Sequence, residues 1–399
     1  MKVLLCHNHY QQPGGEDQVF NDEEELLRAY GHRVVHYIRH NDDIADMSKL
    51  DVAKCTLWNR RTYDELSILI AATRPDVMHC TNTFALISPA AYDAARDLGV
   101  PIVQSLHNFR LLCPNALMLR DGAACEDCLG KMLAWPGIAR GCYRGSRLQT
   151  ATLAGMVAWH RFQGTWVEKV DRYIALADFA REKFIAGGLP AEKISVKPNF
   201  VPGQPVVGTG AGGYALFVGR LSEEKGVATL LEAWKQLPSS MQLKIAGDGP
   251  LAPLVKAAMQ HDARIDWLGR RTTDEVLRLM ANAECLVLPS ICYENCPKAL
   301  LEAFSVGTPV IASRLGAMAE FVDHRRTGLH FTAGSAEGLA ATVTELNRDG
   351  ALRSSMRKAA REEYELNYTP AANYKLLMNI YESAIGENAA NTRMAALRN

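Results

Sequence analysis

Two acidic residues flank the start of a short helical pattern in the second half of the chain. Glu294 precedes Pro297, and Glu302 follows it within a pattern that ends at Val306. Proline suits the first position of a helix, because it has no amide hydrogen to leave unpaired there. The next three amides are then open donors at the positive end of the helix dipole, which favours an anion. Carboxylates on both sides of an anion site suit a ligand with phosphates between two sets of hydroxyls, as in a nucleotide sugar. The alternative is a strand–loop–helix turn with two solvated glutamates.

Two cations lie on a loop after an apolar run at 214–218. Arg220 and Lys225 are five residues apart, between two glycines. Arginine binds phosphate oxygens through paired N–H groups and lysine binds them as a point charge, so this pair could hold a diphosphate. Two glutamates stand between the cations, and they leave open a surface turn that neutralises itself.

These residues need elements that bring them together. Short apolar runs alternate with amphipathic helical patterns along the chain, which is typical of βαβ units and a mainly parallel sheet. Ligands of such sheets bind at the carboxyl ends of the strands. The fold class is therefore α/β. The predicted strands are 2–6, 32–38, 76–80, 101–105, 171–176 and 193–197 in the first half, and 214–218, 242–246, 264–268, 284–288 and 308–312 in the second.

Two features of the first half lie at predicted strand ends. Gly14 and Gly15 open a helical pattern after the strand 2–6, and His107 follows the strand 101–105. Glycines at such a turn let phosphates approach backbone amides closely, although a plain turn would use them equally well. A single histidine there can be a structural residue or a ligand contact, and the residues alone leave both open.

Five segments of the second half resemble, in order, the motifs of family 4 glycosyltransferases. The resemblance covers nearly the whole chain, and it implies the GT-B fold: two Rossmann-like domains with mainly parallel sheets that face each other across a cleft. It also implies retaining hexosyl transfer from a UDP- or GDP-sugar to a hydroxyl acceptor, with no metal or other cofactor in catalysis. The segments are Gly219-Arg220 to Lys225-Gly226, Ala246 to Pro250, Leu268-Gly269, Glu294-x7-Glu302 and Gly307 to Ala312.

The resemblance also implies roles for single residues. Gly14 and Gly15 would face the donor diphosphate, Glu302 would hold the ribose, and Glu294 with nearby amides would hold the sugar. Where the family has Gly-Phe-Gly after the first glutamate, this chain has Asn295-Cys296-Pro297, which leaves the sugar open. The implied catalytic residues are His107, Arg220, Lys225 and Glu294. The implied donor-binding residues are Gly14, Gly15, Arg220, Lys225, Asn295, Cys296, Lys298, Ala299, Leu300 and Glu302.

Composition shifts predict the domain boundaries. We expect a first domain over 1–200, a Gly- and Pro-rich linker over 201–213 and a nucleotide-sugar-binding domain over 214–368. A helix over 369–386 would cross back to the first domain, as in GT-B enzymes. Residues 387–399 would form a disordered tail.

Four cysteines lie in an insertion over 113–142 of the first domain, where acceptor recognition is expected. A central Cys-x2-Cys in a reducing compartment suits a structural zinc site better than disulfides. An unliganded or redox-sensitive loop is the alternative. The insertion is similar to one in a bacterial subgroup with Leu-His-Asn-x-Arg before the cysteines. The spacing is Cys113-x11-Cys125-x2-Cys128-x13-Cys142.

The charge balance restricts the partners. Formal net charge is +0 at pH 7, so no overall field favours nucleic acid. The region 131–172 is locally basic and holds Trp135, Trp159 and Trp166, which suits docking on an anionic membrane surface. A core helix with a solvated basic flank is the alternative. No apolar run reaches the ~18 residues of a spanning helix, and the N-terminus does not resemble a signal peptide. We therefore expect a cytoplasmic protein, peripheral on the inner face of the membrane.

The expected process is assembly of bacterial surface or extracellular polysaccharide or glycolipid, with a carbohydrate or lipid-linked sugar as acceptor. Two other functions fit the same residues. A GT-B-like nucleotide-sugar epimerase or hydrolase would act without an acceptor. A non-catalytic protein would bind nucleotide sugar only.

Overall fold

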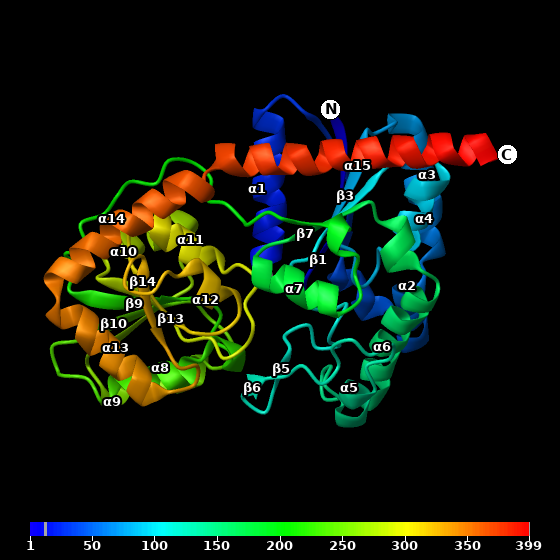
Figure 1. Cartoon of the computed structure of the whole chain (residues 1–399). Helices are drawn as coiled ribbons and strands as arrows, with labels where there is room; N and C mark the ends of the chain where they lie inside the picture. The colour runs from blue at the N-terminus through cyan, green and yellow to red at the C-terminus, as the bar shows by residue number, and fades with distance from the viewer. Residues whose placement is uncertain (12–13, 399) are drawn as a thin grey trace. The chain divides into compact units, whose positions relative to one another are not determined.

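The computed structural model describes residues 1–11 and 14–398 of the 399, with side chains described up to residue 390. The chain forms two compact units, each with its own sheet (Figure 1). Unit 1 comprises Met1–Ala116, Glu126–Lys197 and Tyr374–Asn399, and unit 2 comprises Leu117–Cys125 and Pro198–Asn373.

Unit 1 is built on a six-stranded sheet in which all neighbouring strands are parallel. The order in space is β2-β1-β3-β4-β7-β8, so the chain changes direction across the sheet between β1 and β3. Strands β3 and β4 are buried along their whole length, as strands covered on both faces should be. The strands are β1 (Lys2–His9), β2 (Arg33–His40), β3 (Val77–Asn82), β4 (Ile102–Ser105), β7 (Arg172–Ala175) and β8 (Ile194–Val196).

Helices connect these strands in the βαβ manner that the sequence predicts. The longer ones are amphipathic: α1 buries Val19, Phe20, Leu26 and Leu27, one stripe at helical spacing. The α-helices are α1 (Gly15–Ala29), α2 (Lys49–Leu57), α3 (Arg60–Thr73), α4 (Ala90–Asp97), α5 (Trp135–Arg140), α6 (Arg147–Phe162) and α7 (Asp178–Ala186). Short helical turns are η1 (Asn41–Asp46), η2 (Thr165–Lys169) and η3 (Ala191–Lys193).

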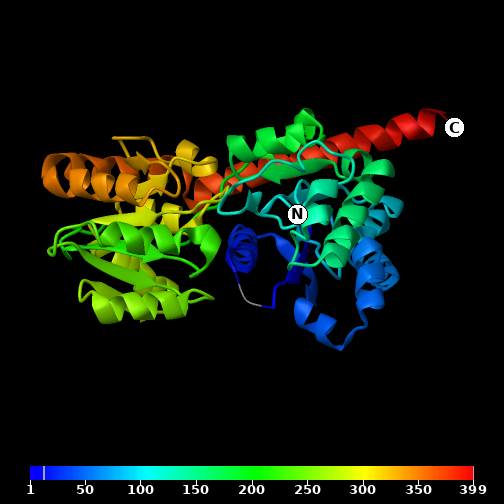
Figure 2. The same cartoon turned by 90° about the horizontal axis from the view of Figure 1, so that it is seen from below.

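The C-terminal helix α15 (Pro370–Arg398) belongs to unit 1 from Tyr374 onward and runs along that unit in both views (Figures 1 and 2). The Tyr381 hydroxyl lies 2.8 Å from Nδ1 of His79, a residue of β3. This contact anchors the helix in the interior of unit 1, because both side chains are fully buried.

The disordered tail expected over 387–399 differs from the structure, which continues α15 to Arg398. Glu387 forms an ion pair with Arg172 of β7, and the Asn388 amide donates to the carbonyl of Gly99 at 2.8 Å. The expectation rested on Gly386 and polar composition. A glycine in a helix costs only about 1 kcal/mol, which contacts with the rest of the unit can offset.

Unit 2 contains a second six-stranded parallel sheet, in the order β11-β10-β9-β12-β13-β14. This is the doubly wound order, with its change of direction between β9 and β12. The strands are β9 (Tyr214–Val218), β10 (Gln242–Ala246), β11 (Ile265–Gly269), β12 (Cys285–Leu288), β13 (Val310–Ser313) and β14 (Gly328–Phe331). A separate antiparallel hairpin joins β5 (Leu119–Arg120) to β6 (Ala123–Ala124).

Alternate residues of the unit 2 strands face one core. Ala215 and Phe217 of β9, and Leu243 and Ile245 of β10, join Trp234 and other side chains of the helices on that side. Trp234 is fully buried there. The helices of unit 2 are α8 (Val227–Trp234), α9 (Ala252–His261), α10 (Thr273–Asn282), α11 (Lys298–Ser305), α12 (Ala317–Phe321), α13 (Ala336–Arg348) and α14 (Gly350–Asn367), with a short turn η4 (Glu223–Lys225).

Candidate functional site

The switch point of unit 2 brings two predicted loops together. The loop after β9 carries Arg220 and Lys225, and the loop after β12 carries Glu294. Gly226 has φ of 69° and packs on the second loop: a Cβ there would lie 1.8 Å from the carbonyl oxygen of Pro289. The amide of Ile291 also donates to the carbonyl of Glu224 at 2.9 Å. The two loops are therefore held in contact by backbone, and only glycine fits at the closest point.

A charged pair joins the same loops. The Lys225 ammonium lies 2.6 Å from Oε1 of Glu294, and Ser290 donates its hydroxyl to that oxygen at 2.7 Å. Burial alone would lower the pKa of Lys225, but the charge of Glu294 and their hydrogen bond outweigh it and hold that pKa above its usual value. For Glu294, burial would raise the pKa, and Lys225 and Ser290 bring it below its usual value. Both groups are thus charged at neutral pH.

Arg220 is exposed and lies on the same loop as Lys225, five residues before it. The preceding Gly219 donates its amide to the carbonyl of Ala246 at 3.1 Å, and the following Leu221 donates to that of Asp248 at 2.9 Å. A Cβ on Gly247 would lie 1.9 Å from the Gly219 carbonyl oxygen. These contacts fix the backbone on both sides of the guanidinium.

The start of α11 differs from the prediction. Pro297 is the N-cap with ψ of 118°, not the first helical residue, and the helix begins at Lys298. The amide of Leu300 donates to the Pro297 carbonyl at 3.0 Å, so it is not the open donor that we expected. Lys298 and Ala299 open the helix at the positive end of its dipole.

The remaining predicted donor-binding residues of unit 2 are mostly buried. Asn295 and Cys296 precede the N-cap, and the carbonyl of Cys296 accepts a hydrogen bond from Asn199 at 3.1 Å. Glu302 lies on the buried face of α11, and its side chain is 8% exposed. Burying a carboxylate costs free energy unless it has partners. The burial of Glu302 therefore argues against the alternative of a solvated surface glutamate.

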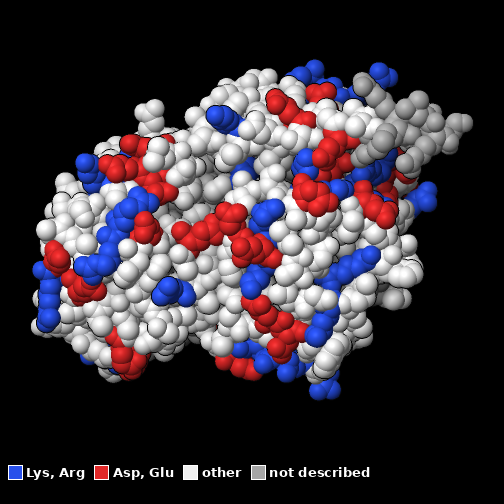
Figure 3. All heavy atoms as spheres, in the orientation of Figure 1, with Lys and Arg blue, Asp and Glu red and all other residues white. Residues whose placement is uncertain are grey.

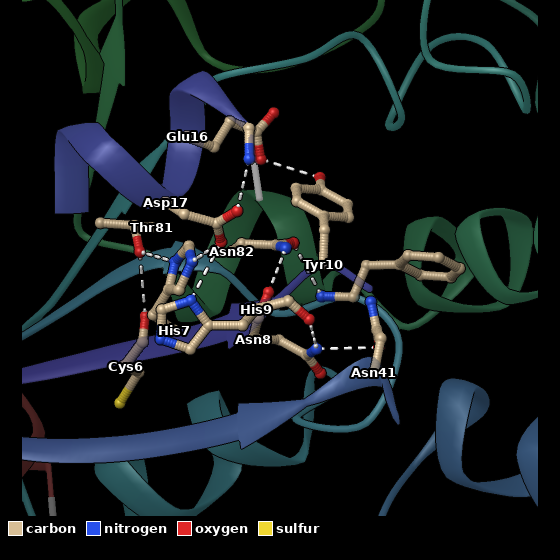
Figure 4. A network of polar contacts seen from close by, with 12 residues as sticks. Cys6, His7, Asn8, His9, Tyr10, Glu16, Asp17, Asn41, Thr81 and Asn82 are labelled. Carbon is tan, nitrogen blue, oxygen red and sulfur yellow. Dashed lines mark hydrogen bonds and ion pairs between the residues drawn. The ribbon is translucent and has the colours of Figure 1, made fainter. Parts of the chain in front are cut away.

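The switch point of unit 1 holds a polar network between β1, β3 and α1 (Figure 4). Nε2 of His7 lies 2.8 Å from Oδ1 of Asp17, and Nδ1 of His9 lies 3.0 Å from the same oxygen. Asp17 also accepts the amide of Gly14 at 2.8 Å. On the far side of the His7 ring, Nδ1 contacts the Thr81 hydroxyl at 2.6 Å. This network holds the Gly14–Gly15 turn at the N-terminus of α1; the residues before it, 12 and 13, lie outside the described part.

Among the residues that the structure describes, His7, His9 and Asp17 are the group whose potential metal-ligand atoms all lie within 4.8 Å. Both histidine nitrogens approach one carboxylate oxygen, which is the geometry of two N–H donors on one acceptor. Burial lowers the pKa of His9, and the two histidines lower that of Asp17 despite its burial. The cluster is therefore explained as a hydrogen-bond network.

His107 follows β4 and lines a cavity of about 70 Å³ in unit 1. Burial lowers its pKa, so the imidazole is neutral at pH 7. The neighbouring Asn108 donates its side-chain amide to Glu16 at 2.9 Å. Glu16 also accepts the Tyr10 hydroxyl at 2.8 Å (Figure 4). His107 therefore lies just after the end of a strand, as predicted, and it forms part of the cavity wall.

A second buried charge network lies in unit 1. The Lys197 ammonium lies 2.6 Å from Oε1 of Glu23, with both side chains 2% exposed or less. Glu23 Oε2 is 3.8 Å from His79, whose Nε2 contacts the Ser105 hydroxyl at 2.8 Å. Burial lowers the pKa of His79 to about 4. Sequence analysis missed these residues together with His7 and Asp17, and it noted Arg110 only as part of the Leu-His-Asn-x-Arg segment without a role of its own. The only signal was polar side chains within or just after apolar strands.

The cysteine segments approach one another around Gly137. A Cβ on Gly137 would lie 3.1 Å from Pro114, next to Cys113 in sequence, and 3.4 Å from the thiol of Cys128. The amide of Cys142 donates to the Gly137 carbonyl at 3.0 Å. All ten cysteines are present as thiols rather than disulfides.

Comparison with known proteins identifies the family. Residues 210–363 match the family described as glycosyl transferases group 1, and residues 14–199 match the glycosyl transferase 4-like domain. The amylovoran biosynthesis glycosyltransferase AmsK of Erwinia amylovora is 29% identical over 225 residues, which are 51% of this chain and 54% of that protein. The sulfoquinovosyl transferase SQD2 of Arabidopsis thaliana is 30% identical over 330 residues, 79% of this chain and 58% of that protein. The matches thus span little more than half of these relatives.

Solved structures share the fold at low identity. Anabaena HepE in complex with UDP superposes with a TM-score of 0.69 at 17% identity, over 96% of this chain and 100% of that chain. Sucrose-phosphate synthase from Thermosynechococcus elongatus gives 0.73 at 16% identity, over 97% and 99%. Both the sequence families and these folds agree with the two parallel sheets described above. The chain belongs to the group 1 glycosyltransferases, with a family 4-like first domain and the GT-B fold.

Proposed function

We propose that this protein transfers a hexose from a nucleoside diphosphate sugar to a hydroxyl of an acceptor, with retention of anomeric configuration. The observation that carries the proposal is the Lys225–Glu294 pair at the switch point of unit 2, between an arginine-bearing loop and the start of α11. Such a switch point is the usual ligand position of a doubly wound sheet.

The chemistry follows from where charge develops. As the glycosidic bond breaks, the departing diphosphate gains negative charge, and fixed cations and amides that face it lower the barrier. Arg220 supplies paired N–H donors, and Lys225 has three donors, of which Glu294 accepts one. These groups could stabilise the charge on the departing diphosphate without a metal ion. A phosphate oxygen could then accept the proton of the acceptor hydroxyl.

Glu302 is the proposed ribose contact and Glu294 the proposed sugar contact. In this arrangement Lys225 orients Glu294 as well as facing the phosphates, since their ion pair fixes the carboxylate. The donor is proposed to be a UDP-sugar. Support comes from HepE, whose solved structures contain UDP, UDP-glucose, or UDP and glucose.

The acceptor is proposed to be a carbohydrate or lipid-linked sugar in bacterial polysaccharide or glycolipid assembly. AmsK is named for amylovoran biosynthesis, and WcaL of Salmonella typhimurium, 27% identical over 238 residues, is named as a putative colanic acid biosynthesis glycosyltransferase. Unit 1 is the proposed acceptor side, with His107 and the Gly14–Gly15 turn contacting the donor sugar and diphosphate.

An exposed apolar stripe on α6 supports docking on a membrane surface. Leu148, Trp159 and Phe162 are 77%, 49% and 78% exposed. Trp159 and Phe162 follow Leu148 by 11 and 14 residues, which are close to three and four helical turns, so the three side chains share one face of the helix. The third tryptophan of the predicted region, Trp166, is buried in the core instead. No helix among the described residues has the length and hydropathy to span a bilayer. Both signs of charge are interspersed on the face in Figure 3, so electrostatic attraction to a bilayer would be local.

A structural zinc ion held by Cys113, Cys125, Cys128 and Cys142 remains a proposal. Its support is the convergence of three of these segments at Gly137. Thiolates are the usual ligands of structural zinc, and no bridge among these residues competes for them.

Donor turnover tests the proposed function. Purified protein should release UDP from a UDP-hexose faster with a lipid-linked or oligosaccharide acceptor than without, and the product should retain the anomeric configuration. Turnover that is equally fast without acceptor would instead indicate an epimerase or hydrolase. Tight UDP-sugar binding without turnover under either condition would indicate a binding protein.

A further inference from the structure

Arg110 is held rigidly at the wall of the unit 1 cavity. It follows β4 in the segment Leu106–Arg110, and its amide donates to the side chain of Asn108 at 3.1 Å. The preceding Phe109 is buried and stacks on Phe184 with ring centroids 5.6 Å apart. The backbone that carries the guanidinium therefore has little freedom.

The guanidinium lies beside two aromatic rings, which are perpendicular to each other with centroids 6.4 Å apart, and it is not paired with an acid. Its central carbon lies 4.2 Å from the centroid of Phe84 and 5.9 Å from that of Tyr143. Nε and Nη1 are buried and have no hydrogen-bond partner among the described residues. The Tyr10 hydroxyl contacts the guanidinium, and that hydroxyl donates to Glu16. Most of the donor capacity of Arg110 is thus unused by the protein.

The cavity has room for a small group and has a cation in its wall. Its volume of about 70 Å³ is several times the ~10–15 Å³ that one water needs. Its lining contains Arg110, His107 and Asn108, and it includes no aspartate or glutamate among the described residues. Nε2 of His107 is a second buried polar atom without a partner in the described part of the chain. Glu16 is held by Tyr10 and Asn108, at 2.8 and 2.9 Å, rather than by Arg110.

Arg110 as a whole is half-buried, but the burial of its Nε and Nη1 without a counter-ion is unfavourable, and such groups in proteins are usually paired. A purely structural arginine would direct its N–H groups to carbonyls or carboxylates, as Arg264 does with Asp262 and three backbone carbonyls. Arg110 instead leaves the donors of Nε and Nη1 unused at a cavity wall, and guanidinium N–H groups are suited to the oxygens of a carboxylate or phosphate.

We propose that Arg110 binds an anionic oxygen group of the acceptor, a phosphate or a sugar carboxylate, inside this cavity. The proposal rests on the proposed function in taking the ligand to be the acceptor; the anion site itself does not depend on it. The neighbouring His107 keeps its proposed contact with the donor sugar. The aromatic rings exclude water and so strengthen the ion pair that forms.

Calorimetry tests the site with defined probes. Inorganic phosphate, glucose 1-phosphate, glucuronate and glucose are titrated into the full chain, with saturating UDP present so that the donor side is occupied. The same titrations use Arg110→Gln, Arg110→Lys and a control, Arg60→Gln, whose exposed guanidinium pairs with Asp64 on α3. We expect at least one anionic probe to bind, with affinity reduced tenfold or more in Arg110→Gln and less in Arg110→Lys. Arg60→Gln should match the unsubstituted protein, and glucose should bind weakly to all.

The pattern of binding identifies the source of the anion. Phosphate and glucose 1-phosphate binding without glucuronate binding supports a phosphorylated acceptor, and the reverse supports a uronic acid. If no anionic probe binds, or if Arg110→Gln binds as well as Arg60→Gln, the proposal is wrong. Should Arg110→Gln fail to fold, Arg110→Lys decides: weakened anion binding supports the site, and unchanged binding contradicts it. Absence of UDP binding in all proteins would overturn the proposed function but leave the Arg110 comparison intact.

Discussion

The Lys225 ammonium lies 2.6 Å from Oε1 of Glu294, joining the loops that follow β9 and β12 at the switch point of unit 2. Neither loop alone would define a site. Together they place a cation and a carboxylate where a doubly wound sheet binds its ligand, and Ser290 fixes the orientation of the carboxylate.

The first prediction separates the roles of the two carboxylates. Glu302→Gln should weaken UDP and UDP-sugar alike by about one to two decades, because charge-assisted hydrogen bonds to ribose contribute roughly 1.5–3 kcal/mol. Glu294→Gln should leave UDP affinity nearly unchanged and lower turnover, because the sugar is held through the step in which charge develops. Calorimetry with UDP and steady-state turnover give the crossed pattern. Equal losses of UDP affinity would contradict the assignment.

Gly226 should be irreplaceable at the junction of the two loops. Gly226→Ala would place a Cβ 1.8 Å from the Pro289 carbonyl oxygen at φ of 69°, so the loops must separate. We expect unit 2 to lose more than 2 kcal/mol of unfolding free energy, roughly the scale of other severe backbone changes, and UDP binding to weaken. Gly334→Ala is the matched control, since Gly334 has φ of 79° with nothing near its Cβ position. Similar denaturant midpoints for both variants would show that the close approach is unimportant.

His79 should make unit 1 sensitive to mild acid. Its pKa is about 4 in the folded protein against 6.5 in the unfolded chain, because burial disfavours the charged ring. The unfolded state then binds a proton first as pH falls from 6.5 toward 4, so stability is complete above 6.5 and declines across that window, by up to about 3 kcal/mol. Denaturant unfolding at several pH values should show this slope, and His79→Gln should flatten it. An unchanged slope in the variant would assign the pH dependence to other groups.

The apolar stripe of α6 should bind anionic vesicles. Leu148→Ser and Phe162→Ser each remove an exposed apolar side chain from one face, and vesicle co-sedimentation should fall several-fold. The loss should be larger at high salt, because charges are screened within about 10 Å at 0.1 M and the apolar contacts then carry more of the binding. Leu366→Ser is the control, an equally exposed leucine on α14 of unit 2 (73%). If the protein does not sediment with vesicles even at low salt, a soluble acceptor is favoured.

The cysteine insertion should carry one zinc ion per chain. Metal analysis of protein purified under reducing conditions should find close to stoichiometric zinc, and Cys125→Ser with Cys128→Ser should remove it and lower the melting temperature. Cys55→Ser is the control, because that thiol lies on α2 outside the insertion. Metal-free protein of unchanged stability would rule out the zinc site.

The sequence by itself determined the fold class and the family. The period of apolar runs and helices predicts two parallel sheets, and the ordered motifs from Gly219 to Ala312 indicate the glycosyltransferase family; both are confirmed. These signals are local in sequence: strand burial, glycine at turns and the spacing of charged groups along one loop or helix.

Only the tertiary structure decided which charges meet. The pairing of Lys225 with Glu294, of Lys197 with Glu23 and of His7 with Asp17 joins residues 69, 174 and 10 positions apart, and no periodicity marks such pairs. The cap at Pro297 and the helical course of residues 387–398 also escaped sequence analysis. Helix ends and tails are decided by small local preferences, which tertiary contacts override. Arg110 shows the same limit: its sequence position indicates a strand end, but the tertiary structure places its guanidinium beside Phe84 and Tyr143 and leaves Nε and Nη1 buried without a partner among the described residues.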